Sequence, residues 1–486
     1  MNTADTGRVA RSLSQQLGAQ LIETHISCIL LTDDIAFKLK KPLRLPFVDY
    51  STLQSRKFFC EEELRLNSRL APSLYLEVVP ITGSPDQPRV GGSGAVLDYA
   101  IRMRRFPEGA LFSQLLQTGS LQPADVDELA ALLARFHTTT PVAQARNGFG
   151  AAQVRRALAF AALDGAAPAM SLGELPALRD WMQSEAQVLS ALWRQRQASG
   201  RVRECHGDLH LANVVRLDGG VAAFDGIEFD PALRWIDVID DISFPIMDFC
   251  HLGSRAFAFR LLNAWLDLTG DHAGLPALRF SIVYRALVRA QVAHLRGPGC
   301  APDARRYIES AQSWTLAGRP GLCVTNGLPG SGKTFESQRL LESEGAIRLR
   351  SDVERKRLFG LSMLDNSRAA GLNLYDREAT VRTYDRLFEL ARMAIGSGYP
   401  AVIDAAFLRR DERDRARALA AELAVPFAIL ACEAPPQALR ARLRTRVGDA
   451  SEADEAVLER LRATAQPLEA DERALCLPAS AGHQNG

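Results

Sequence analysis

The chain has 486 residues, of which 47% are hydrophobic and 24% are charged, so we expect a globular protein with two or more domains. Its 58 Lys and Arg almost balance its 57 Asp and Glu, and a net charge of +1 argues weakly against a nucleic-acid or membrane partner held by bulk electrostatics. No C-x-x-C pair occurs among the eight cysteines, which argues against a zinc site or a disulfide framework. The polar N-terminus and the lack of an apolar run of about 18 residues predict a cytoplasmic protein without a membrane span.

Near the N-terminus, residues 24–31 and 35–40 are two extended runs around a Thr-Asp-Asp turn, the composition of a β-hairpin. Lys38 and Lys40 would share one face of the second strand. Only six of the basic residues are lysines, and three of these lie between positions 38 and 41. Because Lys and Arg differ in geometry and hydration, this clustering favours a functional role.

A helix is predicted over residues 55–70, with the carboxylates Glu61, Glu62 and Glu63 in its middle. A strand lysine paired with a glutamate of the following helix orients the lysine towards ATP phosphates in kinase-type lobes. The alternative is that these side chains are simply solvated. Two further extended runs, 75–81 and 95–103, would complete a small antiparallel sheet, and helices then follow at 124–137, 154–163 and 178–195.

The next informative stretch, residues 205–213, reads C-H-G-D-L-H-L-A-N and is followed by a strand, a tight turn and a returning strand. Antiparallel pairing would place Asp225, at the end of the second strand, beside Asn213, at the start of the first. Asn213 and Asp225 could then hold magnesium, while Asp208 accepts a proton from a hydroxyl group. Turn-forming Asp and Asn are the alternative, which does not explain His206-Gly207-Asp208.

The pattern H-G-D-L-H-x-x-N, followed by a strand and an Asp, resembles the aminoglycoside phosphotransferase and choline kinase group over residues 20 to 300. The resemblance implies an α+β protein-kinase-like fold, Asp208 as catalytic base and magnesium at Asn213 and Asp225. It also implies that Lys38 or Lys40 contacts ATP, with Lys38 the better match, helped by a glutamate such as Glu62. The sequence departs from the pattern in G-I-E-F-D after Asp225 and in the lack of a Gly-rich loop before Lys38.

Three further carboxylates, Asp237, Asp240 and Asp241, are interpreted as helix-start and loop-bracing groups rather than catalysts. Breaker clusters at 296–302 and 316–321 indicate the domain boundary. We therefore expect a phosphotransferase-like domain at 1–300, a helical connector at 301–318 and a second domain at 319–486.

The second domain begins with a match to the phosphate-binding pattern G-x-x-x-x-G-K-[ST], placed between an apolar run and a helical pattern. Its backbone N–H groups would cradle phosphate, its lysine would reach the outer phosphates, and its threonine would hold magnesium. An accidental Gly-rich turn is the alternative, and the strand-loop-helix context argues against it. The candidate ATP-binding residues here are Gly327, Gly330, Ser331, Gly332, Lys333 and Thr334.

Two strand-end carboxylates follow this loop. Asp352 could be a catalytic base or a substrate anchor, and the alternative is the charged first turn of a helix. Asp404 ends an apolar run, as a Walker B carboxylate that bears on magnesium does, although small P-loop kinases sometimes use this position for substrate.

An arginine-rich helix over residues 439–447 is typical of a kinase lid, and at least two of its four arginines would form a solvated face. We take Arg442 as the candidate that contacts ATP, although the sequence does not decide which arginine closes over it. The four arginines are Arg440, Arg442, Arg444 and Arg446.

Residues 319 to 480 resemble the gluconate, shikimate and polynucleotide kinase-like P-loop group, which implies an α/β P-loop NTPase fold with a parallel sheet. The domain order resembles a bacterial family of fusions between an aminoglycoside phosphotransferase-like half and an ATP-binding half of AAA type. The leading hypothesis is a protein with two ATP–Mg²⁺ sites that phosphorylate hydroxyl groups of small molecules. The alternatives are a nucleotide-sensing regulatory protein and a nucleic-acid end kinase in the C-terminal half. Acceptors and oligomeric state stay open.

Overall fold

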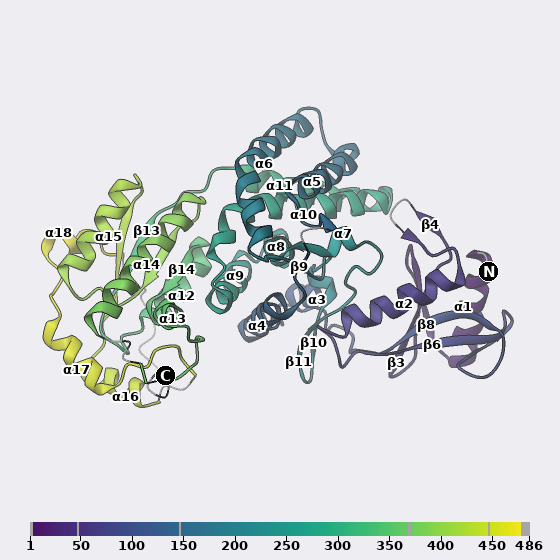
Figure 1. Ribbon diagram of the computed structural model, residues 1–486, viewed down its shortest axis with the longest axis horizontal. Helices are drawn as coiled ribbons and strands as arrows, with labels where there is room; N and C mark the ends of the chain where they lie inside the picture. Colours follow the sequence, from purple (N-terminus) through teal and green to yellow (C-terminus); the bar gives the residue numbers. More distant parts are fainter. Residues whose placement is uncertain are drawn as a thin grey trace. The chain divides into compact units, whose positions relative to one another are not determined.

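The computed structural model describes residues 3–45, 48–144, 147–367, 369, 371–372, 374, 376–445 and 448–477. The chain divides into two compact units, each of which is described by itself (Figure 1). Unit 1 comprises Met1–Ala161 and Ser190–Asp248, and unit 2 comprises Ala162–Leu189 and Phe249–Gly486. Within the described residues, no helix combines the length and the apolar character that crossing a bilayer requires.

Unit 1 begins with an antiparallel sheet in the order β1-β2-β3-β8-β6-β7, so the predicted hairpin and the small antiparallel sheet are confirmed. The sheet strands are β1 (Gln20–Glu23), β2 (Ser27–Leu31), β3 (Ile35–Lys40), β6 (Tyr75–Ser84), β7 (Gln87–Val90) and β8 (Val96–Arg104). A short pair, β4 (Arg44–Leu45) and β5 (Val48–Asp49), follows β3, and the helices α1 (Thr3–Leu17) and α2 (Leu53–Asn67) complete this part.

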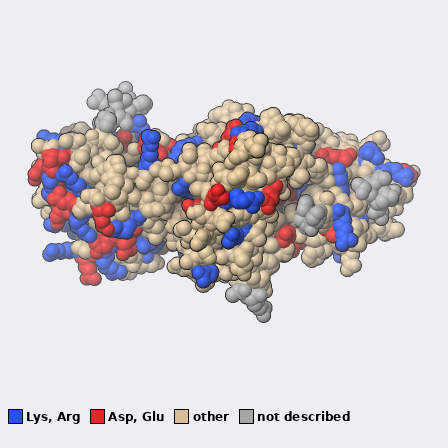
Figure 2. All heavy atoms as spheres, turned by 90° about the horizontal axis from the view of Figure 1, so that it is seen from above, with Lys and Arg blue, Asp and Glu red and all other residues tan. Residues whose placement is uncertain are grey.

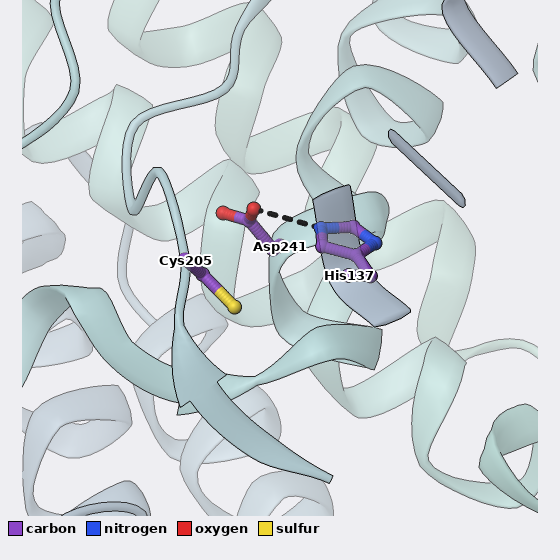
Figure 3. A group of neighbouring side chains, drawn as sticks. All are labelled: His137, Cys205 and Asp241. Carbon is purple, nitrogen blue, oxygen red and sulfur yellow. Dashed lines mark hydrogen bonds and ion pairs between the residues drawn. The ribbon is translucent and has the colours of Figure 1, made fainter. Parts of the chain in front are cut away.

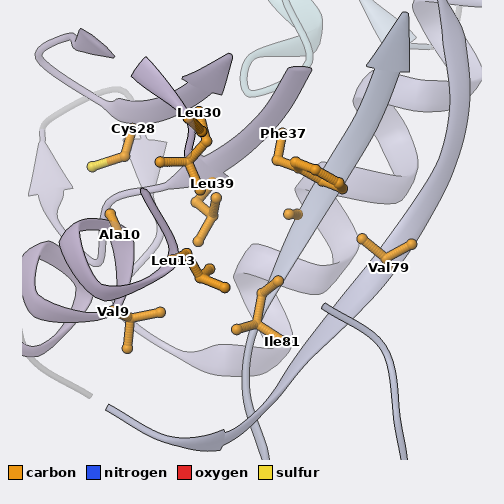
Figure 4. Close-up of a cluster of buried hydrophobic side chains, with 11 residues drawn as sticks. Val9, Ala10, Leu13, Cys28, Leu30, Phe37, Leu39, Val79 and Ile81 are labelled. Carbon is orange, nitrogen blue, oxygen red and sulfur yellow. The ribbon is translucent and has the colours of Figure 1, made fainter. Parts of the chain in front are cut away.

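Strand alternation divides β3 between two environments. Phe37 and Leu39 point to one face, where they pack with Val9 and Leu13 of α1 (Figure 4). On the other face, Ala36 packs in a second apolar cluster that includes Cys60 of α2. Lys38 and Lys40 have the same parity as Ala36, so β3 presents both lysines to the α2 side of the sheet.

Helices dominate the rest of unit 1, as the sequence predicts, and a hairpin carries the His206–Asp225 region. The elements are α3 (Phe112–Gln117), α4 (Pro123–Thr139), α5 (Ala152–Ala166), α6 (Glu174–Ala198), α7 (Pro231–Arg234) and α8 (Val238–His251), with strands β9 (Val202–Glu204), β10 (Val214–Leu217), β11 (Gly220–Ala223) and β12 (Trp235–Asp237). Helices α5, α6 and α8 run from one unit into the other. The β10–β11 register pairs Val214 with Ala223, as a tight turn at Asp218-Gly219 requires.

Unit 2 contains a four-stranded parallel sheet in the order β14-β15-β13-β16, which confirms the predicted α/β fold of the C-terminal region. Its strands are β13 (Leu322–Asn326), β14 (Ile347–Arg350), β15 (Ala401–Asp404) and β16 (Phe427–Ala431). Its helices are α9 (Arg255–Thr269), α10 (Leu275–Leu295), α11 (Ala301–Thr315), α12 (Lys333–Glu344), α13 (Ser351–Leu358), α14 (Arg377–Gly396), α15 (Arg410–Glu422), α16 (Pro436–Thr445), α17 (Glu455–Thr464) and α18 (Ala470–Arg473).

Helix α9 packs along the edge strand β14 of this sheet. The Asn263 side chain accepts a hydrogen bond from the Arg348 backbone N–H (2.6 Å) and donates one to the Ala346 carbonyl (2.9 Å). A buried side-chain amide therefore takes the place of a neighbouring strand at this edge, whose backbone groups would otherwise lack partners.

Candidate active sites

In unit 1, a single buried carboxylate bridges the two strand lysines. Glu63 of α2 is fully buried, and its Oε1 and Oε2 accept hydrogen bonds from Lys38 Nζ (2.8 Å) and Lys40 Nζ (2.7 Å). Lys38 also contacts Asp225, and Lys40 also contacts Glu228, which in turn accepts a hydrogen bond from Tyr50. Charges from three separate segments, β3, α2 and the chain after β11, thus meet in one network, because each buried charge needs a partner.

The lysine partner is Glu63, which corrects our choice of Glu62. Glu62 instead pairs with Arg65 (2.7 Å) and Arg234 (3.0 Å). The buried face of α2 includes Cys60, Glu63 and Leu66, which follow one another at three-residue intervals, and Glu62 lies off that face. Helical periodicity applied to the apolar positions of this helix could therefore have identified the correct glutamate.

Lys38 stays charged inside this network. Burial lowers the pKa of Lys38, but the carboxylates of Asp225 and Glu63 more than offset it, so the pKa lies well above its usual value. Burial and the neighbouring Glu63 raise the pKa of Tyr75, whose hydroxyl accepts a hydrogen bond from the Asp225 backbone N–H (3.2 Å). The site therefore holds a permanent cation beside two carboxylates.

Asn213 and Asp225 meet at one end of the β10–β11 hairpin, as the sequence predicts. The Phe224 N–H donates to the Asn213 carbonyl (3.0 Å), which brings the next residue, Asp225, to the same end. Asp225 has a left-handed backbone (φ 62°), a conformation uncommon outside glycine and enriched at functional sites. Asn213 Nδ2 donates to the Asp208 carbonyl (2.9 Å) and lies 3.5 Å from its carboxylate. Asp208, Asn213 and Asp225 therefore belong to one small region.

The Asp241 side chain holds the backbone of the loop that carries Asp208, as predicted. The Asp241 carboxylate accepts backbone hydrogen bonds from His206 (3.2 Å) and Gly207 (2.9 Å) and lies 3.0 Å from His137 Nε2 (Figure 3). Burial raises the pKa of Asp241, but the His137 hydrogen bond and charge overcome this and lower it to about 2. Burial lowers the pKa of His206, which favours its neutral form.

His137, Cys205 and Asp241 place one potential metal ligand each within 4.8 Å of one another (Figure 3). Both oxygens of Asp241 already accept hydrogen bonds, and burial raises the pKa of the Cys205 thiol well above its usual value. A protonated thiol is a poor metal ligand. We therefore assign this group to bracing the loop.

The donor set of unit 1 fits magnesium bound to a nucleotide. Asn213 donates through its nitrogen, so its amide oxygen is the atom it can offer to a cation, and Asp225 adds a carboxylate that is 46% exposed. Oxygen ligands of this kind suit Mg²⁺, and the Lys38 ammonium suits phosphate oxygens. The roles predicted for Lys38, Asp208, Asn213 and Asp225 stay predictions that this geometry permits.

In unit 2, the phosphate-binding loop joins the carboxyl end of β13 to the start of α12. Gly330 (φ 83°) and Gly332 (φ 97°) use left-handed backbone conformations, and Gly332 directly precedes the first helical residue, Lys333. A Cβ at Gly330 would lie 2.9 Å from the Leu439 carbonyl oxygen, so a side chain there would displace the neighbouring backbone. The buried Ser331 hydroxyl makes no hydrogen bond within the described residues. These features fit a loop shaped to receive phosphate.

This loop opens on a cavity of 350 Å³ that also contains both strand-end carboxylates. Asp404 is buried and accepts a hydrogen bond from Ser337 (3.2 Å), while Thr334 lines the same cavity. Asp352 lies in the first turn of α13, as the alternative interpretation predicts, and its carboxylate pairs with Arg355 (3.0 Å). It also lines the cavity, and its role as a base or substrate anchor stays a prediction. A hydroxyl and a carboxylate beside a phosphate loop suit magnesium.

Of the lid arginines within the described residues, Arg442 is the one that reaches the phosphate loop. It donates to the Gly330 carbonyl (3.0 Å) and lines the cavity. Arg440 and Arg444 pair instead with Glu459 (2.7 Å) and Glu455 (2.6 Å) of α17 on the surface. Two of the four arginines thus form the expected surface face, and Arg446 lies outside the described residues.

Three further residues of the cavity escaped the sequence analysis. Burial raises the pKa of Glu412 and of Tyr384, whose hydroxyl lies 3.4 Å from the Glu412 carboxylate. Burial lowers the pKa of Arg350, but Asp267 and then Asp404 outweigh this and raise it, so Arg350 stays charged. Arg350 carries no local sequence signature of a binding residue, and only its position at the carboxyl end of β14 indicated that it could line a ligand site.

Family models match two separate stretches of the chain, and the first of them extends beyond unit 1 into residues 162–189 and 249–280, which unit 2 contains. Residues 60–280 match the phosphotransferase enzyme family, and residues 322–468 match the AAA domain family. Both matches support ATP-dependent phosphotransfer, and neither identifies an acceptor.

An uncharacterised protein of Mycobacterium tuberculosis is 29% identical over 440 residues, which cover 89% of this chain and 87% of that protein. A gluconokinase from Sinorhizobium meliloti is 19% identical (33% of this chain, 82% of that one; TM-score 0.24). An ethanolamine kinase from Plasmodium vivax is 9% identical (62% of this chain, 82% of that one; TM-score 0.37). The family matches show that the chain joins a region of the phosphotransferase enzyme family type, residues 60–280, to a P-loop kinase-like region, residues 322–468, which contains the parallel sheet.

Proposed function

We propose that the protein is a bifunctional kinase with one ATP–Mg²⁺ site in each family-matched region, and that each site transfers the γ-phosphoryl group to a hydroxyl of a small molecule. The observation that supports the proposal is that each unit brings together a carboxylate suited to act as a base, oxygen atoms suited to hold magnesium, and a lysine suited to bind phosphate. As the functional division we keep residues 1–300 and 319–486, with a helical connector at 301–318.

In unit 1, Asp208 would accept the proton of the acceptor hydroxyl as that oxygen attacks phosphorus. Asn213 and Asp225 would hold magnesium, which supplies charge neutralisation when it is bound. Lys38, fixed by Glu63 (2.8 Å), would position phosphate oxygens. The Asp241 brace fixes the backbone of the Asp208 loop, so the base is held in place before the acceptor arrives.

In unit 2, the loop around Lys333 would bind the β- and γ-phosphates, Thr334 and Asp404 would hold magnesium, and Arg442 would close over the transferring group. Asp352 would accept the acceptor proton. Arg350 and Arg355 line the same cavity, which favours an acceptor that carries an anionic group.

The test is magnesium-dependent ADP release over a panel of sugars, sugar acids, amino alcohols, nucleosides and oligonucleotide ends. Asp208→Asn and Asp352→Asn serve as matched variants, because each removes one candidate base with almost no change in side-chain size. We expect each variant to abolish stimulation by one class of acceptor and to spare the other. If nucleotide binds both units but no acceptor stimulates turnover, the nucleotide-sensing alternative replaces this proposal. If only oligonucleotide ends respond, the end-kinase alternative applies to unit 2.

A further inference from the structure

A second cavity in unit 2 lies away from the phosphate-binding loop. It has a volume of 670 Å³ and shares no lining residue with the cavity that contains Lys333. Its walls include the first turn of α9, the end of α11, and residues 398–400, which precede β15. It therefore lies at the amino ends of β13 and β15, whereas Lys333 and Asp404 follow from their carboxyl ends. Neither proposed phosphotransfer reaction uses it.

The lining is rich in arginine. The charged lining residues are two glutamates, Glu309 and Glu344, and four arginines: Arg255, Arg279, Arg306 and Arg319. Arg306 pairs with Asp303 (2.5 Å), and Glu309 pairs with Arg305 (3.0 Å), so these two are satisfied by residues outside the cavity. Three arginines and one glutamate remain, which leaves an excess of positive charge.

These arginines keep their charge available. Arg279 donates to the carbonyls of Trp314 (2.9 Å) and Leu316 (2.5 Å), which are neutral acceptors. Arg255 lies over the ring of Phe259 (4.6 Å from its centroid). Within the described residues, neither Arg255 nor Arg319 forms an ion pair. Guanidinium groups without a carboxylate partner around one cavity suit a multiply charged anion.

Tyr399 supplies a second observation that points to a ligand. Its side chain lines the cavity and is 3% exposed, and its hydroxyl makes no hydrogen bond within the described residues. Burial raises the pKa of Tyr399, while Arg279 and Arg255 act in the opposite direction. Arg279 packs against this segment, with one guanidinium nitrogen 3.6 Å from the Cβ position of the neighbouring Gly398. A buried polar group without a partner is costly, and one beside cations is satisfied when it donates to an anion.

We propose that this cavity is a binding site for a phosphate-bearing small molecule, held by Arg255, Arg279 and Arg319 and by the Tyr399 hydroxyl. A phosphate group offers the oxygens and the double charge that this set of donors can use. The cavity is larger than phosphate alone, and the Trp314 and His251 side chains line the remaining space, which suits an organic portion.

The test is a calorimetric titration of the full chain with inorganic phosphate and with glycerol 3-phosphate. The ionic strength is held constant, and a titration with chloride is the control. The measurement is made in the Lys333→Ala background, which weakens phosphate binding at the P-loop. We expect binding to persist in that background and to be lost when Arg255→Gln and Arg319→Gln are added. Arg194→Gln, which removes an exposed arginine of α6 outside the cavity, should leave it unchanged.

Tyr399→Phe separates ligand binding from folding. Because the hydroxyl has no partner in the protein, we expect its removal to leave the unfolding midpoint unchanged or slightly raised. It should weaken phosphate binding by about tenfold, the value of one charge-assisted hydrogen bond. Absence of binding in the Lys333→Ala background, or full binding in the double arginine variant, would overturn the proposal. Neither result depends on turnover at either proposed active site.

Discussion

The two candidate sites are held together in different ways. In unit 1, the site depends on side-chain charges from distant segments: Lys38, Glu63, Asp225 and Glu228 come from β3, α2 and the chain after β11, and two of the four, Glu63 and Glu228, are buried. In unit 2, one contiguous loop forms the phosphate cradle from backbone N–H groups and glycine conformations. The first arrangement links catalysis to the stability of the unit, and the second separates them. On the face shown in Figure 2, basic and acidic side chains are interspersed.

The largest expected effect is the selective loss of one activity. We expect Lys333→Ala to lower kcat/KM of the unit 2 reaction by about 10²–10³-fold, as for other removed electrostatic donors. Asp208→Asn should lower that of the unit 1 reaction by about 10²–10⁴-fold, the usual contribution of a general base. ADP release with each acceptor measures both. Equal loss of both activities in either variant would mean that the sites are not independent.

The second effect tests whether the buried charge network of the unit 1 site contributes to the stability of unit 1. Glu63→Gln removes one of the two carboxylates that each lysine contacts, while Asp225 and Glu228 remain. We therefore expect it to destabilise unit 1 by about 1.5–3 kcal/mol, the cost of weakened hydrogen bonds between charged groups. Glu62→Gln is the matched control: its partner Arg65 is half exposed, and its buried partner Arg234 keeps a second carboxylate, Glu204, so the change should cost about 1 kcal/mol or less.

Urea unfolding followed by circular dichroism measures both glutamate variants, with Lys333→Ala as the unit 2 counterpart, which should change stability little. Equal midpoints for Glu63→Gln and Glu62→Gln would contradict the bridging role of Glu63.

A third effect concerns the sheet edge in unit 2, where the Asn263 side chain binds the backbone of β14 and its neighbour. The phosphate loop, in contrast, depends on its own backbone conformation. Asn263→Ala removes the partners of the Arg348 N–H and the Ala346 carbonyl, both buried. We expect a loss of about 1–3 kcal/mol and faster amide exchange in β14. Asn263→Asp is the informative companion, because it keeps the acceptor for Arg348 and loses the donor to Ala346. Unchanged exchange at Arg348 in the alanine variant would show that the edge is satisfied otherwise.

The smallest effect is the pH dependence of the brace beneath Asp208. The pKa of Asp241 is about 2 in the folded protein and about 3.9 in an unfolded chain, so Asp241 adds about 2 kcal/mol of stability above pH 4, which is lost as pH falls towards 2. The lowered pKa of His206 acts at higher pH: below about 6.5 the unfolded chain binds a proton that the folded protein resists, so stability falls with falling pH.

Urea midpoints measured between pH 3 and pH 8 would show this fall in stability with falling pH. We expect Asp241→Asn to be less stable at pH 7 and to lose less stability between pH 5 and pH 3. An unchanged acid limb in that variant would remove Asp241 from the explanation.

Much of this protein could be predicted from sequence because its signals are local. The phosphate loop is eight consecutive residues, the Asp208–Asn213 segment is six, and the register of the β10–β11 hairpin follows from its turn, so Asp225 could be placed beside Asn213 in advance. Alternation along β3 likewise placed Lys38 and Lys40 on one face. Short-range geometry fixes each of these features.

Tertiary structure decided the partners. Glu63 rather than Glu62 meets the lysines because α2 turns that face towards the sheet, and Glu228 meets Lys40 across 188 positions of sequence. Arg442 reaches the phosphate loop, whereas Arg440 and Arg444 lie on the side of α16 that faces α17. There they form surface ion pairs with Glu459 and Glu455. A pattern of residues determines which side chains share a face of one element, but the packing of elements distant in sequence determines what that face meets.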